Sequence, residues 1–314
     1  MPHTRILLAV SAAALCLWGI TAALAHPWGG LVVDEHGHVY FTFICPFVDD
    51  DHHACVWRLD DEHEPTAVLV SRHSPSDIVL ARSRDRTVFG AERTGTDPAH
   101  RARLWRFEGD DWTPLIPPTT DPDQFHVQAF AVGDAGTIFF ARGGRLFERD
   151  STGSTAPLEP DADFGRIDAM AWGPSATLYI VAQGTLYLRA PDGTLTLRAA
   201  GLKEENPEDL PFAGANILFD VAVDERGNAF VAYYGNRRVL KVSPSGAVTT
   251  FLRAESPWSP HGVDVFEGAL YVLESTVGGG SWWAFWERPV TIPRVRKVNP
   301  DGTVATVFEY RPGD

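Results

Sequence analysis

A repeated pattern of four short strands restricts the possible folds of this chain more than any other feature of its sequence. The most regular copy, residues 219–252, has four apolar or alternating runs separated by turn signals, among them DERG at 224–227 and SPSG at 243–246. Short runs bounded by such turns predict four antiparallel strands. One four-stranded sheet cannot bury both of its faces alone, so the pattern predicts neighbouring sheets of the same kind.

Copies of this unit occur along nearly the whole chain. The second strand of each copy starts with an apolar residue followed by an aromatic one. These aromatics lie 40 to 51 residues apart, at Tyr40, Phe89, Phe139, Tyr179, Phe230 and Tyr271. Third strands recur too, as in VWRLD from Val56 and LWRFE from Leu104. Six such units predict an all-β chain, a six-bladed β-propeller of four-stranded antiparallel blades, rather than an unrelated β-sandwich.

The first 25 residues are typical of a cleaved signal peptide. Arg5 precedes an apolar stretch at 6–20, and Ala23-Leu24-Ala25 provides a small-x-small cleavage site. The apolar stretch is short for a membrane span, and no later segment is apolar enough. We therefore expect cleavage after Ala25, a single propeller domain over residues 26–314, no membrane span in the mature chain, and a periplasmic or secreted location.

Two cysteines remain after this cleavage, Cys45 and Cys55. In an exported chain, two cysteines ten positions apart predict one disulfide, and metal binding by thiolates is disfavoured there. The formal net charge of the whole chain is −14. This charge excludes nucleic acid or an anionic membrane as the main partner, and we interpret it as a source of solubility.

Three long insertions point to the functional face. Residues 44–55, 92–103 and 277–293 each join the second strand of a blade to its third, in blades one, two and six. Those connections all lie on one face of a propeller, here called the top face, where the first strands begin. Binding residues concentrate on such loops. We expect a monomer whose partner, an unknown protein, peptide or small molecule, binds the top face around blades six, one and two.

Polar residues at the starts of the first strands would surround the top mouth of the central channel. His261 is the strongest candidate, because Pro260 and Gly262 place it where a strand enters the channel. Further polar candidates for ligand binding are Asp77, His126 and Gln128 at such starts, and Glu92. Glu274 ends the second strand of blade six at the top, and Glu92 occupies the matching place in blade two. His261, Glu274 and Asp168 are candidate acid–base residues, and Asp168 with His261 could bind a divalent cation such as calcium or zinc. The alternative is a hydrated channel in which these groups satisfy the backbone.

The insertion of blade six contains Trp282, Trp283 and Trp286. Exposed aromatics of this kind suggest a surface for a sugar, peptide or protein. The alternative is that these rings pack on the seam between blades six and one.

The stretch FDVAVDERGNAFVAYYGNRRVLKVSPSG resembles the NHL repeat, and HGVDVFEGALYVLE and GLVVDEHGHVYFTF are weaker copies. This resemblance implies a six-bladed propeller related to the regucalcin/gluconolactonase and streptogramin-lyase-like propellers. The lactonase resemblance implies a channel metal held by Glu, Asn and Asp. Asp168 falls at the Asn position, whereas Phe219 and Gly29 or Trp28 fall at the other two, so two of the three depart. The lyase resemblance implies a channel-mouth histidine, which His261 matches.

Two classes of function follow from these features. The chain is either a scaffold that binds a ligand or protein at its top face, or a metal-dependent hydrolase or lyase that acts at the mouth of the channel.

Overall fold

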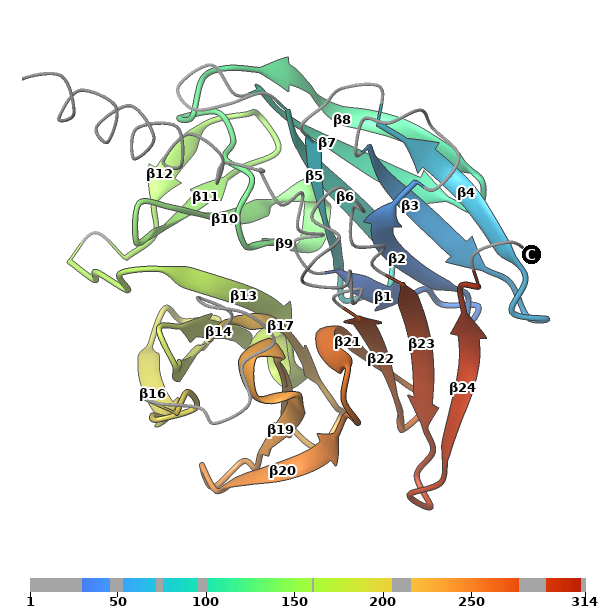
Figure 1. Ribbon diagram of the computed structural model, residues 1–314. Coiled ribbons are helices and arrows are strands. Elements are labelled where there is room, and N and C mark those ends of the chain that lie inside the picture. Colours follow the sequence, from blue (N-terminus) through green and yellow to red (C-terminus); the bar gives the residue numbers. More distant parts are fainter. Residues whose placement is uncertain are drawn as a thin grey trace, which may run out of the picture.

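The computed structural model of the chain describes residues 30–45, 53–71, 76–94, 101–159, 161–204, 216–276 and 292–311. These residues form six four-stranded antiparallel sheets. Figure 1 shows the sheets arranged as blades around a channel, with the first strands innermost and the fourth strands outermost. The predicted six-bladed β-propeller is therefore confirmed.

The strands follow one another around the ring in chain order. Blade one consists of β1 (Leu31–Val33), β2 (Val39–Ile44), β3 (Ala54–Leu59) and β4 (Pro65–Val70), and blade two of β5 (Ser76–Arg82), β6 (Val88–Thr94), β7 (Arg101–Glu108) and β8 (Asp111–Thr119). Blade three consists of β9 (Phe130–Val132), β10 (Ile138–Arg142), β11 (Arg145–Arg149) and β12 (Thr155–Pro157), and blade four of β13 (Ile167–Trp172), β14 (Leu178–Ala182), β15 (Thr185–Arg189) and β16 (Leu195–Ala199). Blade five consists of β17 (Leu218–Val223), β18 (Ala229–Tyr233), β19 (Arg238–Val242) and β20 (Val248–Arg253), and blade six of β21 (Trp258–Phe266), β22 (Ala269–Thr276), β23 (Pro293–Val298) and β24 (Val304–Glu309).

The predicted turn signals form the hairpins of the bottom face. Between β17 and β18 one carboxylate oxygen of Asp224 accepts the N–H groups of Arg226 and Asn228, at 2.9 and 2.8 Å. Gly227 takes a positive φ of 76° in the same turn, which glycine adopts without steric cost. The local sequence therefore fixes this hairpin without help from the rest of the fold.

The aromatic residues of the second strands help to bury the faces between blades. The Tyr40 ring of blade one lies 6.1 Å from the Phe107 ring of blade two, between centroids. The Phe139 ring of blade three meets the Trp172 ring of blade four edge-on at 5.3 Å. Each blade thus covers a face of its neighbour. This packing buries the apolar faces that a single four-stranded sheet cannot bury alone.

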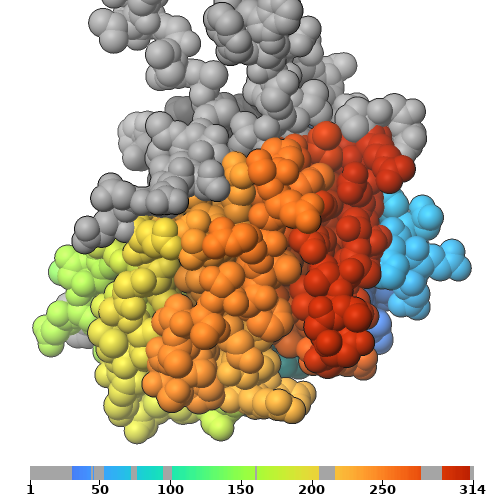
Figure 2. All heavy atoms as spheres, turned by 60° about the horizontal axis from the view of Figure 1, so that its bottom comes forward, coloured from blue at the N-terminus to red at the C-terminus, as the bar shows by residue number. Residues whose placement is uncertain are grey.

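Blades one and six close the ring without exchanging a strand within the described parts of the chain. Figure 2 shows the red strands of blade six beside the blue of blade one. Buried residues of both blades form one cluster at this seam, which includes Leu31, Phe41, Tyr271 and Leu273. A Cβ on Gly262 would lie only 2.9 Å from the backbone nitrogen of Leu31, so the two channel strands are in close contact.

The predicted disulfide joins Cys45, just after β2, to Cys55 in β3, with Cα atoms 5.4 Å apart. Both cysteines are buried within the cluster at the seam. Among the described residues, no helix has the length and apolar character needed to cross a membrane.

Candidate functional site

The first strands of blades four, five and six share a β-bulge at the top end of the channel. Pairing with the second strand shifts by one residue between Ile167 and Ala169, between Leu218 and Asp220, and between Pro260 and Gly262. The extra residues are Asp168, Phe219 and His261. A bulge re-aims the side chain of the extra residue and commonly lies beside a functional site. These three residues therefore occupy equivalent positions at the channel mouth.

His261 is buried at this mouth, and no described residue is a polar partner of its ring. Its exposed fraction is 1%, and neither ring nitrogen has a hydrogen-bond partner among the residues that the structure describes. The rings of Phe219 and Tyr234 meet the imidazole edge-on, with centroids 6.3 and 6.4 Å away. Burial lowers the pKa of His261 to about 3, so the imidazole is neutral at physiological pH.

Two more buried polar side chains on the elements around His261 lack partners among the described residues. Ser259 lies two residues before it on β21, and Asn236 lies in the 3-10 turn Tyr234–Asn236, which contacts β21. The Oγ of Ser259 and the Nδ2 of Asn236 are buried, and no described residue forms a hydrogen bond with either atom. We call His261, Ser259 and Asn236 the top polar cluster. Because most buried polar groups in native proteins are satisfied, such a cluster needs an explanation.

Glu274 and Glu92 occupy matching places in blades six and two, as their sequence positions indicate. Glu274 is completely buried, and its Oε2 accepts a 2.6 Å hydrogen bond from the Nε of Arg294. The Arg294 guanidinium also lies over the Trp258 ring, 4.0 Å from its centroid. A second arginine, Arg296, lies 3.4 Å from Glu274. The carboxylate of Glu274 is thus held as half of an ion pair.

Blade two repeats this arrangement. Glu92 is also completely buried and is ion-paired with Arg103, whose guanidinium lies 4.6 Å from the centroid of Trp105. The cross-strand register places Glu92 opposite Arg103 and Glu274 opposite Arg294. Both glutamates therefore have a structural partner on the next strand, which sequence spacing did not reveal.

Asp168 also has partners. It forms an ion pair with Arg166 at 2.9 Å and accepts the N–H of Gln183 at 3.2 Å. Burial raises its pKa, and the charge of Arg166 opposes that effect. Gln128 donates from its Nε2 to the carbonyl of Ile167 in the next blade, at 2.9 Å.

The remaining predicted residues are spread around the ring. Asp77, at the start of blade two, pairs with Arg93 at 3.0 Å, and His126 precedes β9 of blade three and is partly buried. Trp282, Trp283 and Trp286 lie outside the described residues.

A divalent-metal site is not assembled by the residues that the structure describes. Those residues contain no group of three or more His, Cys, Asp or Glu side chains that could hold a metal ion. Asp168 is paired with Arg166, and the position equivalent to it in blade five is Phe219. The described residues therefore do not fit the channel metal that the lactonase resemblance implies, and no step of a mechanism is derived through it.

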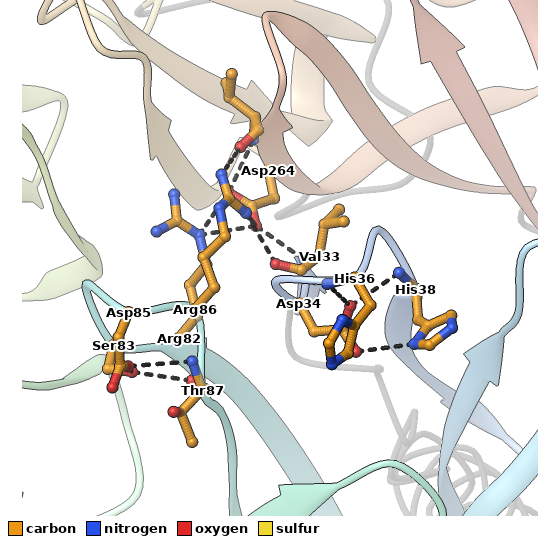
Figure 3. Close-up of polar contacts among 11 residues, drawn as sticks. Val33, Asp34, His36, His38, Arg82, Ser83, Asp85, Arg86, Thr87 and Asp264 are labelled. Atoms are coloured by element: carbon orange, nitrogen blue, oxygen red, sulfur yellow. Dashed lines mark hydrogen bonds and ion pairs between the residues drawn. The ribbon is translucent and has the colours of Figure 1, made fainter.

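The bottom half of the channel contains a polar network that sequence reasoning missed. Arg82, the last residue of β5, and Arg86, in the turn after it, extend to Asp264 of β21, as Figure 3 shows. Asp264 in turn accepts the N–H of Val33 in blade one, at 2.9 Å. One signal was present in the sequence, because residues 83–86 read SRDR where the equivalent turns of blades one and five read DEHG at 34–37 and DERG at 224–227.

These features define the chain as a six-bladed β-propeller with a polar channel mouth. No family model and no curated protein matches it. Among solved structures, it is similar to a streptogramin B lyase, with 12% identity over 91% of this chain and 84% of that one and a TM-score of 0.53.

Two further similar structures are a luciferin-regenerating enzyme and a putative gluconolactonase. The first has 14% identity over 86% of this chain and 90% of that one, with a TM-score of 0.55. The second has 15% identity over 78% and 84%, with a TM-score of 0.50. At these identities the likeness establishes a shared fold, as the sequence resemblance to lyase-like and lactonase-like propellers predicted.

Proposed function

We propose that this propeller is a binding protein whose ligand occupies the top mouth of the channel at blades five and six. The observation that carries the proposal is the buried imidazole of His261, which has no partner on either nitrogen among the described residues. Ser259 on the same strand and Asn236 in the 3-10 turn that contacts this strand also have buried polar atoms without a described partner. Leaving a buried donor or acceptor unsatisfied costs about 1–3 kcal/mol. A ligand that completes these hydrogen bonds would recover that cost.

The chemistry of the cluster favours a neutral ligand with polar and apolar parts. A neutral imidazole offers one donor and one acceptor, and the Asn236 amide and Ser259 hydroxyl can add further hydrogen bonds. Phe219 and Tyr234 supply apolar contacts at the same mouth. The nearby carboxylate of Glu274 is already neutralised by Arg294 and so does not demand a cationic ligand.

The alternative is a lyase or hydrolase in which His261 accepts a proton. Its neutral form and the lyase and lactonase propellers of similar fold support this alternative. However, a general base works best when its pKa is near the working pH, and the pKa of His261 is about 3. The free protein is therefore better suited to binding through His261 than to proton abstraction.

Two predicted features extend the proposal. The site would continue toward the insertions of blades six, one and two, with Trp282, Trp283 and Trp286 as further contacts. The protein would act in the periplasm or outside the cell, with which the buried Cys45–Cys55 disulfide is compatible.

Titration with small neutral probes tests the proposal. We would follow the ring nitrogens of His261 by NMR in ¹⁵N-histidine-labelled protein while adding N-methylacetamide, δ-valerolactone or methyl glucoside. We expect at least one probe to shift the His261 signals and raise the melting temperature of the wild type, and to leave the melting temperature of His261→Phe unchanged. His36, which is exposed on a bottom hairpin, provides the control as His36→Phe.

Equal responses of the wild type and His261→Phe to every probe would refute a binding site at His261. If a lactone or amide is instead consumed, and only by proteins that retain His261, the enzyme alternative replaces the binding proposal.

A further inference from the structure

A small cavity occupies the lower half of the channel, away from the top polar cluster. Its volume is about 30 Å³, which is room for one or two water-sized groups. The residues around it come from blades one, two, four, five and six, and its polar side chains are Arg82, Asp220 and Asp264, with Trp172 beside them. The cavity therefore offers a charged wall to a group of the size of a carboxylate.

Asp264 fixes the orientation of the Arg82 guanidinium. The Nε of Arg82 lies 2.9 and 2.8 Å from the two carboxylate oxygens of Asp264. Asp264 is itself held by the N–H groups of Val33 and Val265, at 2.9 and 2.8 Å, and its side chain is only 4% exposed. The guanidinium is thus attached to the wall of the channel through one of its three nitrogens.

The two terminal amino groups of Arg82 remain open. Neither has a hydrogen-bond or ion-pair partner within the part of the chain that the structure describes, and the side chain is 14% exposed. Figure 3 shows these two nitrogens on the side of the guanidinium that faces away from Asp264. Two parallel N–H groups of this kind match the two oxygens of a planar carboxylate.

Arg86 differs from Arg82, because its donors are already used. One terminal nitrogen donates to the carbonyl of Val33 at 2.9 Å, and the other donates to the carbonyl of Val265. It also lies 3.6 Å from Asp264. Arg86 therefore joins blades one and six. Its positive charge adds to that of Arg82, but its terminal amino groups are not available to bind an anion.

The charge balance at this place allows an anion. Two guanidinium groups face one carboxylate, that of Asp264. The other acid beside the cavity is Asp220, and burial raises its pKa to about 8, so it does not carry a full negative charge at neutral pH. With only one guanidinium end open, the site suits a singly charged carboxylate better than a doubly charged phosphate.

We propose that the open end of Arg82, oriented by Asp264, binds the carboxylate group of a small monocarboxylate at the bottom half of the channel. The carboxylate accepts one hydrogen bond from each terminal amino group of Arg82, and the rest of the molecule extends toward the bottom mouth. This site is separate from the top polar cluster and does not depend on the function proposed there.

Calorimetric titration of the purified protein with formate and acetate, at constant ionic strength, tests the site. We expect binding in the millimolar range and a higher melting temperature in the presence of either ion. Arg82→Lys keeps the positive charge but loses the planar pair of donors, so its affinity for acetate should fall about tenfold or more. Arg84→Lys is the matched control, because Arg84 pairs with Asp134 on the exposed surface.

Three outcomes would overturn the proposal. They are no saturable binding of formate or acetate by the wild type, equal affinity in Arg82→Lys, or chloride binding as tightly as acetate, which would indicate a site for halide ions. If Arg82→Lys does not fold, NMR of the arginine side chains in the wild type decides. Acetate should then shift the terminal N–H signals of one channel arginine, and unchanged signals would contradict the site.

Discussion

The carboxylate of Asp220 in blade five accepts the backbone N–H of Val263 in blade six, at 3.0 Å. Its other oxygen accepts the N–H of Val221, at 2.9 Å, and the backbone of Leu31 in blade one contributes a further hydrogen bond. One partly buried side chain thus connects the channel strands of three blades. Val263 follows His261 by two residues, so the backbone that carries the top polar cluster is fixed from the neighbouring blade.

Asp220 should make the protein less stable as the pH rises. Its pKa is raised to about 8 in the folded state, so the folded chain keeps a proton that the unfolded chain releases above about pH 4. The free energy of unfolding therefore falls between these two pH values. Asp220→Asn cannot titrate and should lose less stability than the wild type from pH 5 to about 8. Urea unfolding curves of both proteins across this range measure the difference, and parallel pH profiles would contradict the assignment.

His261 should have the opposite effect at acidic pH. Its pKa is lowered to about 3, so between that value and about 6.5 the unfolded state binds a proton that the folded state does not. Stability is therefore lost as the pH falls, by about 3 kcal/mol near pH 4 for this residue alone. His261→Phe removes this loss, and it should also be more stable than the wild type at pH 7, because it no longer buries unpaired nitrogens. Equal acid sensitivity of the two proteins in urea unfolding would contradict a buried neutral imidazole.

Gly262→Ala should destabilise the seam between blades six and one. The added Cβ would lie 2.9 Å from the nitrogen of Leu31 and 3.0 Å from its Cβ, so a channel strand would have to move. We expect a loss of roughly 2–4 kcal/mol in the free energy of unfolding. Gly302→Ala is the control, because its φ is positive but no atom lies within 4 Å of the added Cβ. It should cost only about 1 kcal/mol, and an equal loss in both variants would show that close packing is not the cause.

Glu274→Gln should lower the stability of the protein more than the same substitution at a surface glutamate. It leaves the guanidinium of Arg294, which is only 11% exposed, without its counter-charge, and removing one partner of a buried pair typically costs about 3–5 kcal/mol. Glu108→Gln breaks the exposed pair with Arg106 and should change stability by less than about 1 kcal/mol. Thermal unfolding of the two variants measures both losses, and a small loss in Glu274→Gln would argue against a stabilising ion pair.

Cys45→Ser should lower the melting temperature only under oxidising conditions. The Cys45–Cys55 bond closes a short loop at the end of blade one, and it should contribute about 2–3 kcal/mol by constraining the unfolded chain. Adding a reductant to the wild type should reproduce the variant. If the wild type and Cys45→Ser have the same melting temperature without reductant, the disulfide does not stabilise the protein.

The positions of the candidate residues within their blades could be predicted from the sequence, but their partners could not. The predicted equivalence of Glu92 and Glu274 is confirmed by their matching cross-strand registers. Their arginine partners lie in third strands, and the register that pairs them depends on the length of the intervening loop. Likewise, Pro260-His261-Gly262 marked the channel entrance, whereas the missing partners of His261 depend on which groups the other blades bring near it.

The sequence by itself determined the strands, the turns and the number of blades. Alternating apolar residues and turn residues act over a few positions, so Tyr40 and Phe230 could be placed at the starts of their strands from the sequence alone. Only the tertiary structure decided how the ring closes and what lies in the channel. Arg82 meets Asp264 across 182 positions of sequence, because closure of the ring places blades two and six on either side of blade one. A pattern read over short distances does not specify such a contact, which depends on the rotation accumulated over all six blades.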